Sequence, residues 1–177
     1  MSRPFSSAPL ALVCFGGVLV MAAGGDAGAT STPPAAVPAG QPQKGAAPQP
    51  LDIPTKSGTL TLMAPAGATA VKTDRHLEVT AGPGFRIEIH AGIGDLPRFK
   101  QDVQANTLNV FKRFALDEPP LGMIYESAVG GVPEHHIVFI VRGVMRGLVC
   151  RDTKGPAYTE AQARAMYDAC KTLTLKP

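Results

Sequence analysis

Apolar and polar residues alternate along the second half of the chain in a way that predicts β-strands. Residues 58–64 alternate threonine with leucine, and residues 76–81 continue the same period. In residues 85–90, apolar side chains occupy the odd-numbered positions and polar ones the even-numbered positions. The Gly-Pro-Gly sequence at 82–84 turns the chain between the last two segments. We therefore expect three early strands.

A change of period predicts one amphipathic helix over residues 95–115. Asp95 stands at the N-cap position and Pro97 falls in the first turn, both typical of a helix start. The pair Pro119-Pro120 cannot continue a helix. Apolar or small residues recur at spacings of three and four: Leu96, Phe99, Val103, Thr107, Val110 and Phe114.

The remaining pattern predicts three strands, a second helix and a final strand. Strands are expected at 123–129, 137–141 and 144–150, and the short loops between them favour antiparallel hairpins. The strand at 137–141 is apolar at every position, as expected of a strand covered on both faces. Thr159 and Gln162 form a capping-box pair that opens a helix through Lys171.

With a last strand at 173–175, the predicted order is β-β-β-α-β-β-β-α-β. This order indicates an α+β fold, a mostly antiparallel sheet with two main helices in an α/β/α sandwich.

This element order resembles that of the PsbP-like domains, a family of small α/β/α sandwiches. The resemblance lies in the early strands, the helix at 95–115, the meander at 123–150 and the final helix and strand. It covers most of residues 57–177. Members of that family support photosystem assembly or bind protein partners, and several are exported. The resemblance implies an accessory module, and it implies no functional residue because no binding motif of the family is present.

The amino end has the features of a cleavable secretory signal. Residues 1–9 carry Arg3 and no acid, and residues 10–23 are almost continuously apolar. Ala27-Gly28-Ala29 fits the small-x-small rule of signal peptidase, which predicts a signal peptide over residues 1–29. Cleavage after Ala23 is an alternative.

Other interpretations of this segment stay open. It would be short and glycine-rich for an uncleaved membrane anchor. Cys14 would serve as a lipidated cysteine, although Val13 precedes it where a lipoprotein signal has a small residue. A buried core helix would show amphipathic spacing or a cap, and neither is present.

Composition divides the rest of the chain into two parts. Residues 30–56 contain seven prolines and no aromatic residue, which predicts a Pro/Ala-rich disordered linker with polyproline II character. Residues 57–177, about 120 residues, have the size of a single α/β domain.

Charge argues against nucleic acid as a partner. The whole chain has a formal net charge of +3, and residues 57–177 contain 14 Lys and Arg against 12 Asp and Glu. No basic stripe is present, whereas binding driven by phosphates needs clustered positive charge.

Two cysteines remain once the predicted leader is removed. Cys150 ends a predicted strand and Cys170 lies near the end of a predicted helix. In an oxidising compartment such a pair forms a disulfide, and the alternative is two buried free thiols. A redox-active pair is disfavoured because there is no Cys-x-x-Cys sequence.

Histidines near acidic residues invite a metal interpretation. In Glu134-His135-His136, however, adjacent strand side chains point to opposite faces, so the two histidines cannot share one ion. A polar cluster flanking a turn is the better interpretation. His76 and His90 are expected to stand alone at the surface.

Three further features lack the pattern of a catalytic or cofactor site. Gly92-Ile93-Gly94 precedes a predicted helix but lacks the rest of a nucleotide-binding fingerprint, which favours a plain loop. Ser127 lies in no Gly-x-Ser-x-Gly sequence. Asp117-Glu118 is expected to be a solvated helix terminus. We therefore identify no catalytic, cofactor or metal residue, although Arg86, Glu88 and His90 share the outer side of one predicted strand.

The sequence thus favours an exported cell-envelope or secreted binding module without catalytic chemistry. The expected partner is an envelope protein, and a membrane only if the leader or Cys14 acts as an anchor. The alternative is a small extracytoplasmic hydrolase with a site assembled from dispersed histidines and acids. A membrane-tethered stalk is a third hypothesis.

Overall fold

A computed structural model of the protein describes residues 47–143 and 147–176. The predicted leader (1–29) and the predicted linker as far as residue 46 lie outside the described residues. The same holds for the start of the predicted strand at 144–150.

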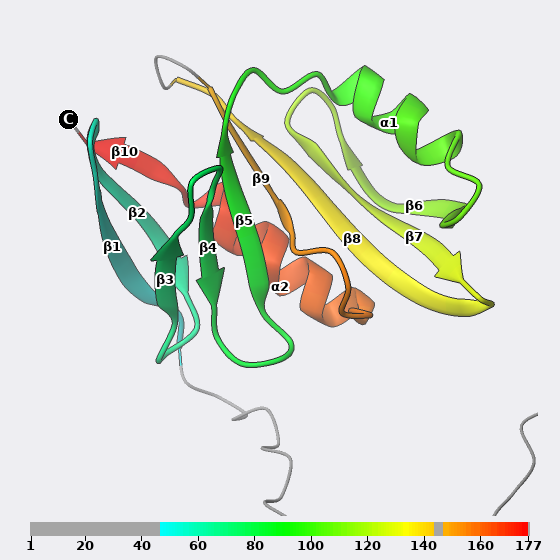
Figure 1. Ribbon diagram of the computed structural model, residues 1–177, viewed down its shortest axis with the longest axis horizontal. Helices are drawn as coiled ribbons and strands as arrows, with labels where there is room; N and C mark the ends of the chain where they lie inside the picture. Colours follow the sequence, from blue (N-terminus) through cyan, green and yellow to red (C-terminus); the bar gives the residue numbers. More distant parts are fainter. Residues whose placement is uncertain (1–46, 144–146, 177) are drawn as a thin grey trace, which may run out of the picture. The chain divides into compact units, whose positions relative to one another are not determined.

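The described residues form two antiparallel sheets and two helices (Figure 1). One sheet has three strands in the order β1-β2-β10, and the other has seven in the order β3-β4-β5-β9-β8-β7-β6. The bounds are β1 Gln49–Thr55, β2 Gly58–Ala64, β3 Thr69–Lys72, β4 Leu77–Thr80, β5 Arg86–Ala91, α1 Leu96–Gln104, β6 Val110–Glu118, β7 Gly122–Val129, β8 Val132–Val141, β9 Leu148–Asp152, α2 Glu160–Lys171 and β10 Thr174–Lys176.

The seven-stranded sheet is covered on both faces. Along β8, Ile137, Phe139 and Val141 belong to the main core, whereas Val138 and Ile140 belong to a second core that contains Leu96 of α1. The alternation places α1 on one face and α2 on the other, because successive strand side chains point to opposite sides. This confirms the predicted α+β class, the mostly antiparallel pairing and the doubly covered strand at 137–141.

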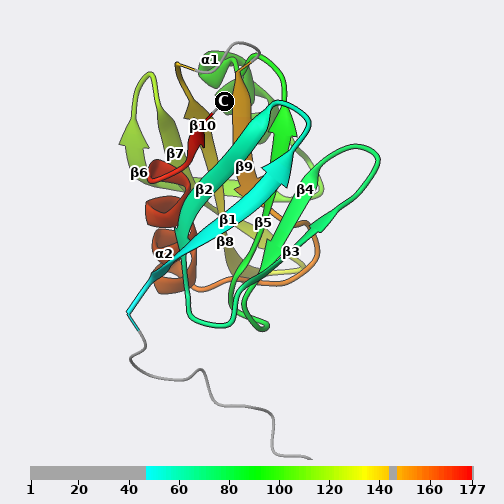
Figure 2. The ribbon, with the colours of Figure 1, turned by 90° about the vertical axis from the view of Figure 1, so that its left-hand side faces the viewer.

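The three-stranded sheet shares the main core with α2. Figure 2 shows the β1–β2 hairpin crossing in front of β5 and β9, with α2 beside it. Leu60 and Leu62 of β2 are buried in the same core as Ile87 and Ile89 of β5. The face of the seven-stranded sheet that carries α2 is therefore shared between that helix and a second sheet.

The predicted helix at 95–115 is correct at its start and wrong beyond residue 104. The side chain of Asp95 caps α1 by accepting a hydrogen bond from the Arg98 N–H at 3.2 Å. After α1, the Asn106 side chain accepts hydrogen bonds from the N–H groups of Leu108 and Asn109. Such a local turn competes with a helix, and β6 follows at once.

Irregular pairing explains why this strand has a helical spacing. The register of β6 against β7 shifts between Phe111 and Arg113 and again between Phe114 and Leu116. Each bulge adds a residue to one strand and resets the alternation of its side chains. Apolar positions therefore recur at intervals of three and four in a segment that is extended.

The sequence patterns did not predict two strands, and both lie at the edge of a sheet. An edge strand places weaker requirements on its sequence than a central strand does. The predicted linker at 30–56 contains β1, so the expectation of disorder is wrong for residues 49–55. Pro50 and Pro54 suggested disorder, yet β1 is an edge strand, where a missing backbone donor is tolerated. The four-residue strand β3 is the other such case. With β6, these give three strands more than the predicted order.

Candidate functional site

A cavity of about 1140 Å³ lies between the two sheets. Its walls are largely apolar. The three-stranded sheet contributes Ile53, Leu60 and Leu175, and the seven-stranded sheet contributes Ala70, Leu77, Ile89, Ala91 and Leu148. Ala70, Ala91, Gly143 and Gly147 fill little volume, which explains why side chains do not close the space between the sheets.

Charged residues surround this cavity asymmetrically. Lys56, Lys72 and Arg75 contribute to the lining, and all three are exposed. Asp74 is the one carboxylate among the lining residues in the described part of the chain. The excess of positive charge favours an anionic group at the edge of the cavity, because three cations face a single acid.

A row of charged side chains crosses the face of the seven-stranded sheet that points away from the main core. Arg86 and Glu88 of β5 alternate with core residues, as predicted. The row continues to β4, where Glu78 Oε1 accepts a hydrogen bond from Arg86 Nη2 at 2.6 Å. It continues to β9, where Arg151 Nε and Nη2 donate to Glu88 Oε2 at 3.1 and 3.0 Å.

Glu88 is held in its charged form by these neighbours. Burial is the largest single influence and raises the pKa of its carboxyl group. Hydrogen bonds from His90 and Arg151, with the charges of Arg151 and His76, outweigh burial and bring the pKa below its ordinary value. A deprotonated carboxylate therefore lies largely buried on this face of the sheet.

His76 and His90 do not stand alone, so the prediction for these two residues is wrong. Their ring centroids are 4.9 Å apart and the ring planes are tilted by 32°. His90 Nε2 is 2.8 Å from Glu88 Oε2. One imidazole nitrogen of each histidine and one oxygen of Glu88 all lie within 4.8 Å of one another. The fold thus gathers two imidazoles and a carboxylate.

The Glu134-His135-His136 segment lies in β8, the strand that directly follows the turn at Gly130-Gly131. His136 and Glu134 are buried on the α1 face of the sheet. His136 Nδ1 is 2.8 Å from Asp152 Oδ2, and its Nε2 is 3.2 Å from Glu134 Oε1. Burial, the largest influence, lowers the pKa of His136, but the two carboxylates outweigh it and the pKa is raised.

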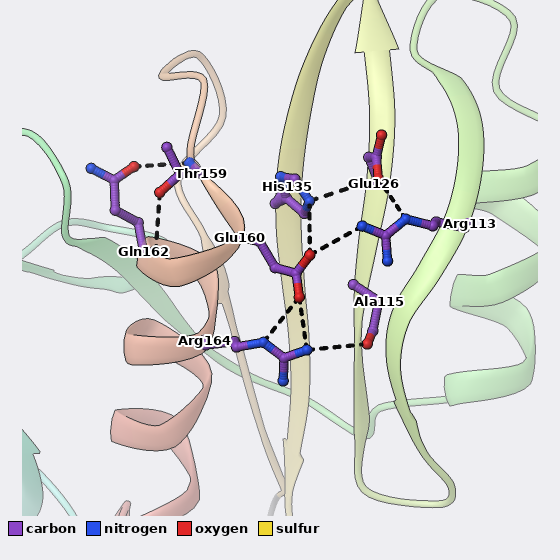
Figure 3. Close-up of polar contacts among 8 residues, drawn as sticks. All are labelled: Arg113, Ala115, Glu126, His135, Thr159, Glu160, Gln162 and Arg164. Atoms are coloured by element: carbon purple, nitrogen blue, oxygen red, sulfur yellow. Dashed lines mark hydrogen bonds and ion pairs between the residues drawn. The ribbon is translucent and has the colours of Figure 1, made fainter.

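The neighbouring histidine belongs to a separate network on the α2 face (Figure 3). His135 Nε2 lies 3.8 Å from Glu126 Oε2 and 3.7 Å from Glu160 Oε2. Arg113 bridges the same two carboxylates at 2.7 and 3.0 Å. The geometry confirms that His135 and His136 cannot share an ion. The network connects β6, β7 and β8 to the first turn of α2.

The predicted disulfide between Cys150 and Cys170 is present. Cys150 lies on β9 and Cys170 in the last turn of α2, and both are fully buried in the main core. The bond therefore ties the helix to the centre of the seven-stranded sheet. Thr159 and Gln162 form the expected capping box at the other end of the helix (Figure 3).

His136 and Ser127 do not form a pair of general base and nucleophile. His136 faces a carboxylate at each ring nitrogen, so neither nitrogen is placed to take a proton from a nucleophile. Ser127 is fully buried. Asp117 and Glu118 end β6 and not a helix, and they bind Lys100 and Lys171 respectively.

The Gly92-Ile93-Gly94 segment has the contacts of a plain loop. The N–H of Gly92 donates to the carbonyl of Gly147, and Gly94 packs against the side chain of Ile140. The Asp95 carboxylate occupies the start of α1, where an anion would otherwise accept hydrogen bonds.

The cavity could not be found from local patterns, because its lining residues extend from Ile53 to Leu175 along the chain. The histidine pair did leave a signal. His76 and His90 are each seven residues from Pro83, so a hairpin centred on the predicted turn places them opposite one another.

Within residues 47–143 and 147–176, no helix has both the length and the apolar character needed to cross a membrane. Comparisons of the chain with protein-family models, with curated proteins and with solved structures find no match.

Proposed function

We propose that this protein is a non-catalytic binding module that acts outside the cytoplasm and holds an amphipathic molecule with an anionic head group. The observation that carries the proposal is the apolar cavity between the two sheets with its basic edge. Small-molecule sites in proteins are concave, mostly apolar and supplied with a few polar groups that orient the ligand. The cavity has each of these properties.

The volume of the cavity favours a ligand with an extended apolar part. At about 1140 Å³ it is slightly larger than the usual range of ligand sites, about 300–1,000 Å³. Branched aliphatic side chains from both sheets line it, so an acyl or similar chain would meet apolar atoms on two sides. Transfer of such a chain from water contributes about 0.8 kcal/mol for each buried methylene.

The charges at the edge favour an anionic head group over a cationic one. Lys72 and Arg75 lie on the β3–β4 side of the cavity, and Lys56 lies in the β1–β2 turn. A carboxylate or phosphate at the edge would lie close to several cations while its apolar chain occupies the interior. Exposed cations give specificity and a faster encounter rate more than they give affinity.

Two features support action outside the cytoplasm. The buried disulfide is the kind of cross-link that persists in oxidising compartments. The first 29 residues have the charge, apolar run and small residues of a secretory signal.

The binding proposal predicts that dodecanoate displaces the fluorescent anion 1-anilinonaphthalene-8-sulfonate from the protein. Dodecyltrimethylammonium, which has the same chain and the opposite charge, is expected to displace it at least about 10-fold less effectively, since its head meets like charge. The measurement is a fluorescence displacement titration at amphiphile concentrations below those at which micelles form.

Matched variants separate the two parts of the site. Lys72→Glu combined with Arg75→Glu reverses the charge of the edge and should weaken dodecanoate binding about 10-fold. Ala70→Trp narrows the cavity and should weaken both amphiphiles. Lys112→Glu, on the opposite edge strand β6, is the control and should change neither. Equal binding of the two amphiphiles by every variant would contradict the proposal.

The export part of the proposal predicts a processed amino end. When the full-length chain is expressed in a bacterium with an intact secretion pathway, the protein recovered from outside the cytoplasm should begin near Thr30. Mass spectrometry of the intact protein measures this directly. Recovery in the cytoplasm with Met1 in place would contradict export while leaving the binding result unaffected.

A further inference from the structure

The donor set that β4 and β5 bring together has the composition of a metal site. His76 precedes β4, and Glu88 and His90 lie on β5. Each offers one donor atom, and the three atoms lie within 4.8 Å of one another. Donors around a tetrahedral ion held at about 2.0–2.1 Å are about 3.3–3.4 Å apart, so the three donor atoms must move closer together to bind one. Small rotations of the side chains would close the site.

The hairpin geometry places these donors on one face. Leu77 pairs with Ile89, so the next pair along the ladder is His76 with His90. Side chains opposite each other in an antiparallel pair have Cβ atoms about 4.5–5.5 Å apart. Glu88 is two residues from His90 and therefore shares its face. The three donors are thus held by the backbone of one hairpin.

The surroundings keep the site accessible and correctly charged. The side chain of His90 is 24% exposed, so solvent reaches it, whereas that of Glu88 is only 12% exposed. Arg151 donates both of its hydrogen bonds to Oε2 of Glu88. By binding this one oxygen, Arg151 orients the carboxylate of Glu88 and leaves Oε1 for a metal ion. Hydrogen-bond partners of metal ligands commonly orient them in this way.

The chemistry of the donors selects the ion. Two imidazole nitrogens and one carboxylate oxygen suit a divalent transition metal ion, and three protein ligands leave a coordination position for water or another ligand. Ca²⁺ and Mg²⁺ prefer oxygen ligands throughout. Zn²⁺ fits the set best because it is usually held by four ligands in a tetrahedral arrangement, three of which these residues supply.

We propose that His76, Glu88 and His90 form a site for a divalent transition metal ion, with Zn²⁺ as the first candidate. The three ligands come from β5 and the residue before β4, and Arg151 of β9 orients one of them. The site does not depend on an amphiphile in the cavity, although His76 also belongs to the lining of that cavity.

The test is a Zn²⁺ titration of the purified full chain after treatment with a chelator. Cys14→Ser is present in every sample, so that no free thiol competes for the metal. We expect one Zn²⁺ per chain with a Kd of about 10 μM or tighter. Glu88→Gln, His76→Ala and His90→Ala should each weaken binding about 10- to 100-fold. The melting temperature should rise on adding Zn²⁺ only where binding is retained.

His135→Gln is the matched control, since it removes a histidine beside two carboxylates on the other face of the sheet. Its Zn²⁺ affinity should equal that of the parent chain. Co²⁺ provides a second measurement, because its visible absorption bands report coordination by the protein and should disappear in His90→Ala. A parent chain that binds no Zn²⁺ at about 100 μM, or a His90→Ala variant with unchanged affinity, would overturn the proposal.

Discussion

Replacing Asp152 with alanine is expected to lower the free energy of unfolding by about 3–5 kcal/mol. The Asp152 carboxylate is buried at the end of β9 and bridges to β8. Its Oδ1 accepts a hydrogen bond from the Ile137 N–H at 2.7 Å, and its Oδ2 is 2.8 Å from His136 Nδ1. Alanine would leave a buried N–H and a buried imidazole without these partners. Urea unfolding measures the loss.

A second variant tests whether the charge of Asp152 or its hydrogen bonds contribute more to the free energy of unfolding, and a third serves as the control. Asp152→Asn keeps an oxygen for the Ile137 N–H and removes the charge beside His136, so it should destabilise less than alanine. Asp102→Ala removes an exposed carboxylate from α1 and should change stability by less than about 0.5 kcal/mol. If Asp152→Ala behaved like Asp102→Ala, the bridge would have no structural role.

The same contacts give stability a defined dependence on pH. The pKa of His136 is raised in the folded protein above its ordinary value of 6.5. Its contribution to stability is therefore fully present below 6.5 and is lost as the pH rises through the folded pKa. We expect the free energy of unfolding to fall with rising pH from about 6.5 upward. His136→Gln should show a shallower fall over the same interval, measured by urea unfolding at several pH values.

Removing the disulfide is expected to cost about 3 kcal/mol of stability. Cys150 and Cys170 are separated by 20 residues, and the bond limits the freedom of the unfolded chain over that loop. Replacing both residues with alanine removes the cross-link that ties α2 to β9. The unfolding midpoint in urea should fall accordingly.

Reduction of the parent protein provides the matched control for this variant. A thiol reductant should destabilise the parent by a similar amount and should leave the double alanine variant unchanged. The variant also loses two buried sulfur atoms, so its loss should be equal to or larger than that caused by reduction. A parent protein equally stable with and without reductant would show that the bond does not stabilise the fold.

Patterns within single segments predicted much of the fold. The capping pair Thr159 and Gln162, the N-cap Asp95 and the doubly apolar strand at 137–141 each depend on residues a few positions apart. The physical causes are local, namely the hydrogen bonds of helix ends and the alternation of strand side chains. The pairing of Cys150 with Cys170 was also predictable, because only two cysteines follow the predicted leader.

The errors arose where a neighbouring strand decides the conformation. The bulged strand β6 has an apolar spacing that also fits a helix, and only its ladder with β7 keeps it extended. The proline-containing strand β1 is ordered because β2 offers it a partner. A spacing pattern contains no information about such a partner, so tertiary structure overrides local preference at these two places.

For the candidate sites, the amino-acid pattern was enough to show which residue types are present and that β4 and β5 form a hairpin about Pro83. It thereby fixed the distance along the chain between His76 and His90. The contact of Arg151 with Glu88 and the cavity with a basic edge between the two sheets follow from long-range packing. The reason is physical: a hairpin brings near neighbours together through a short loop, whereas a cavity forms from residues that meet only after both sheets have packed.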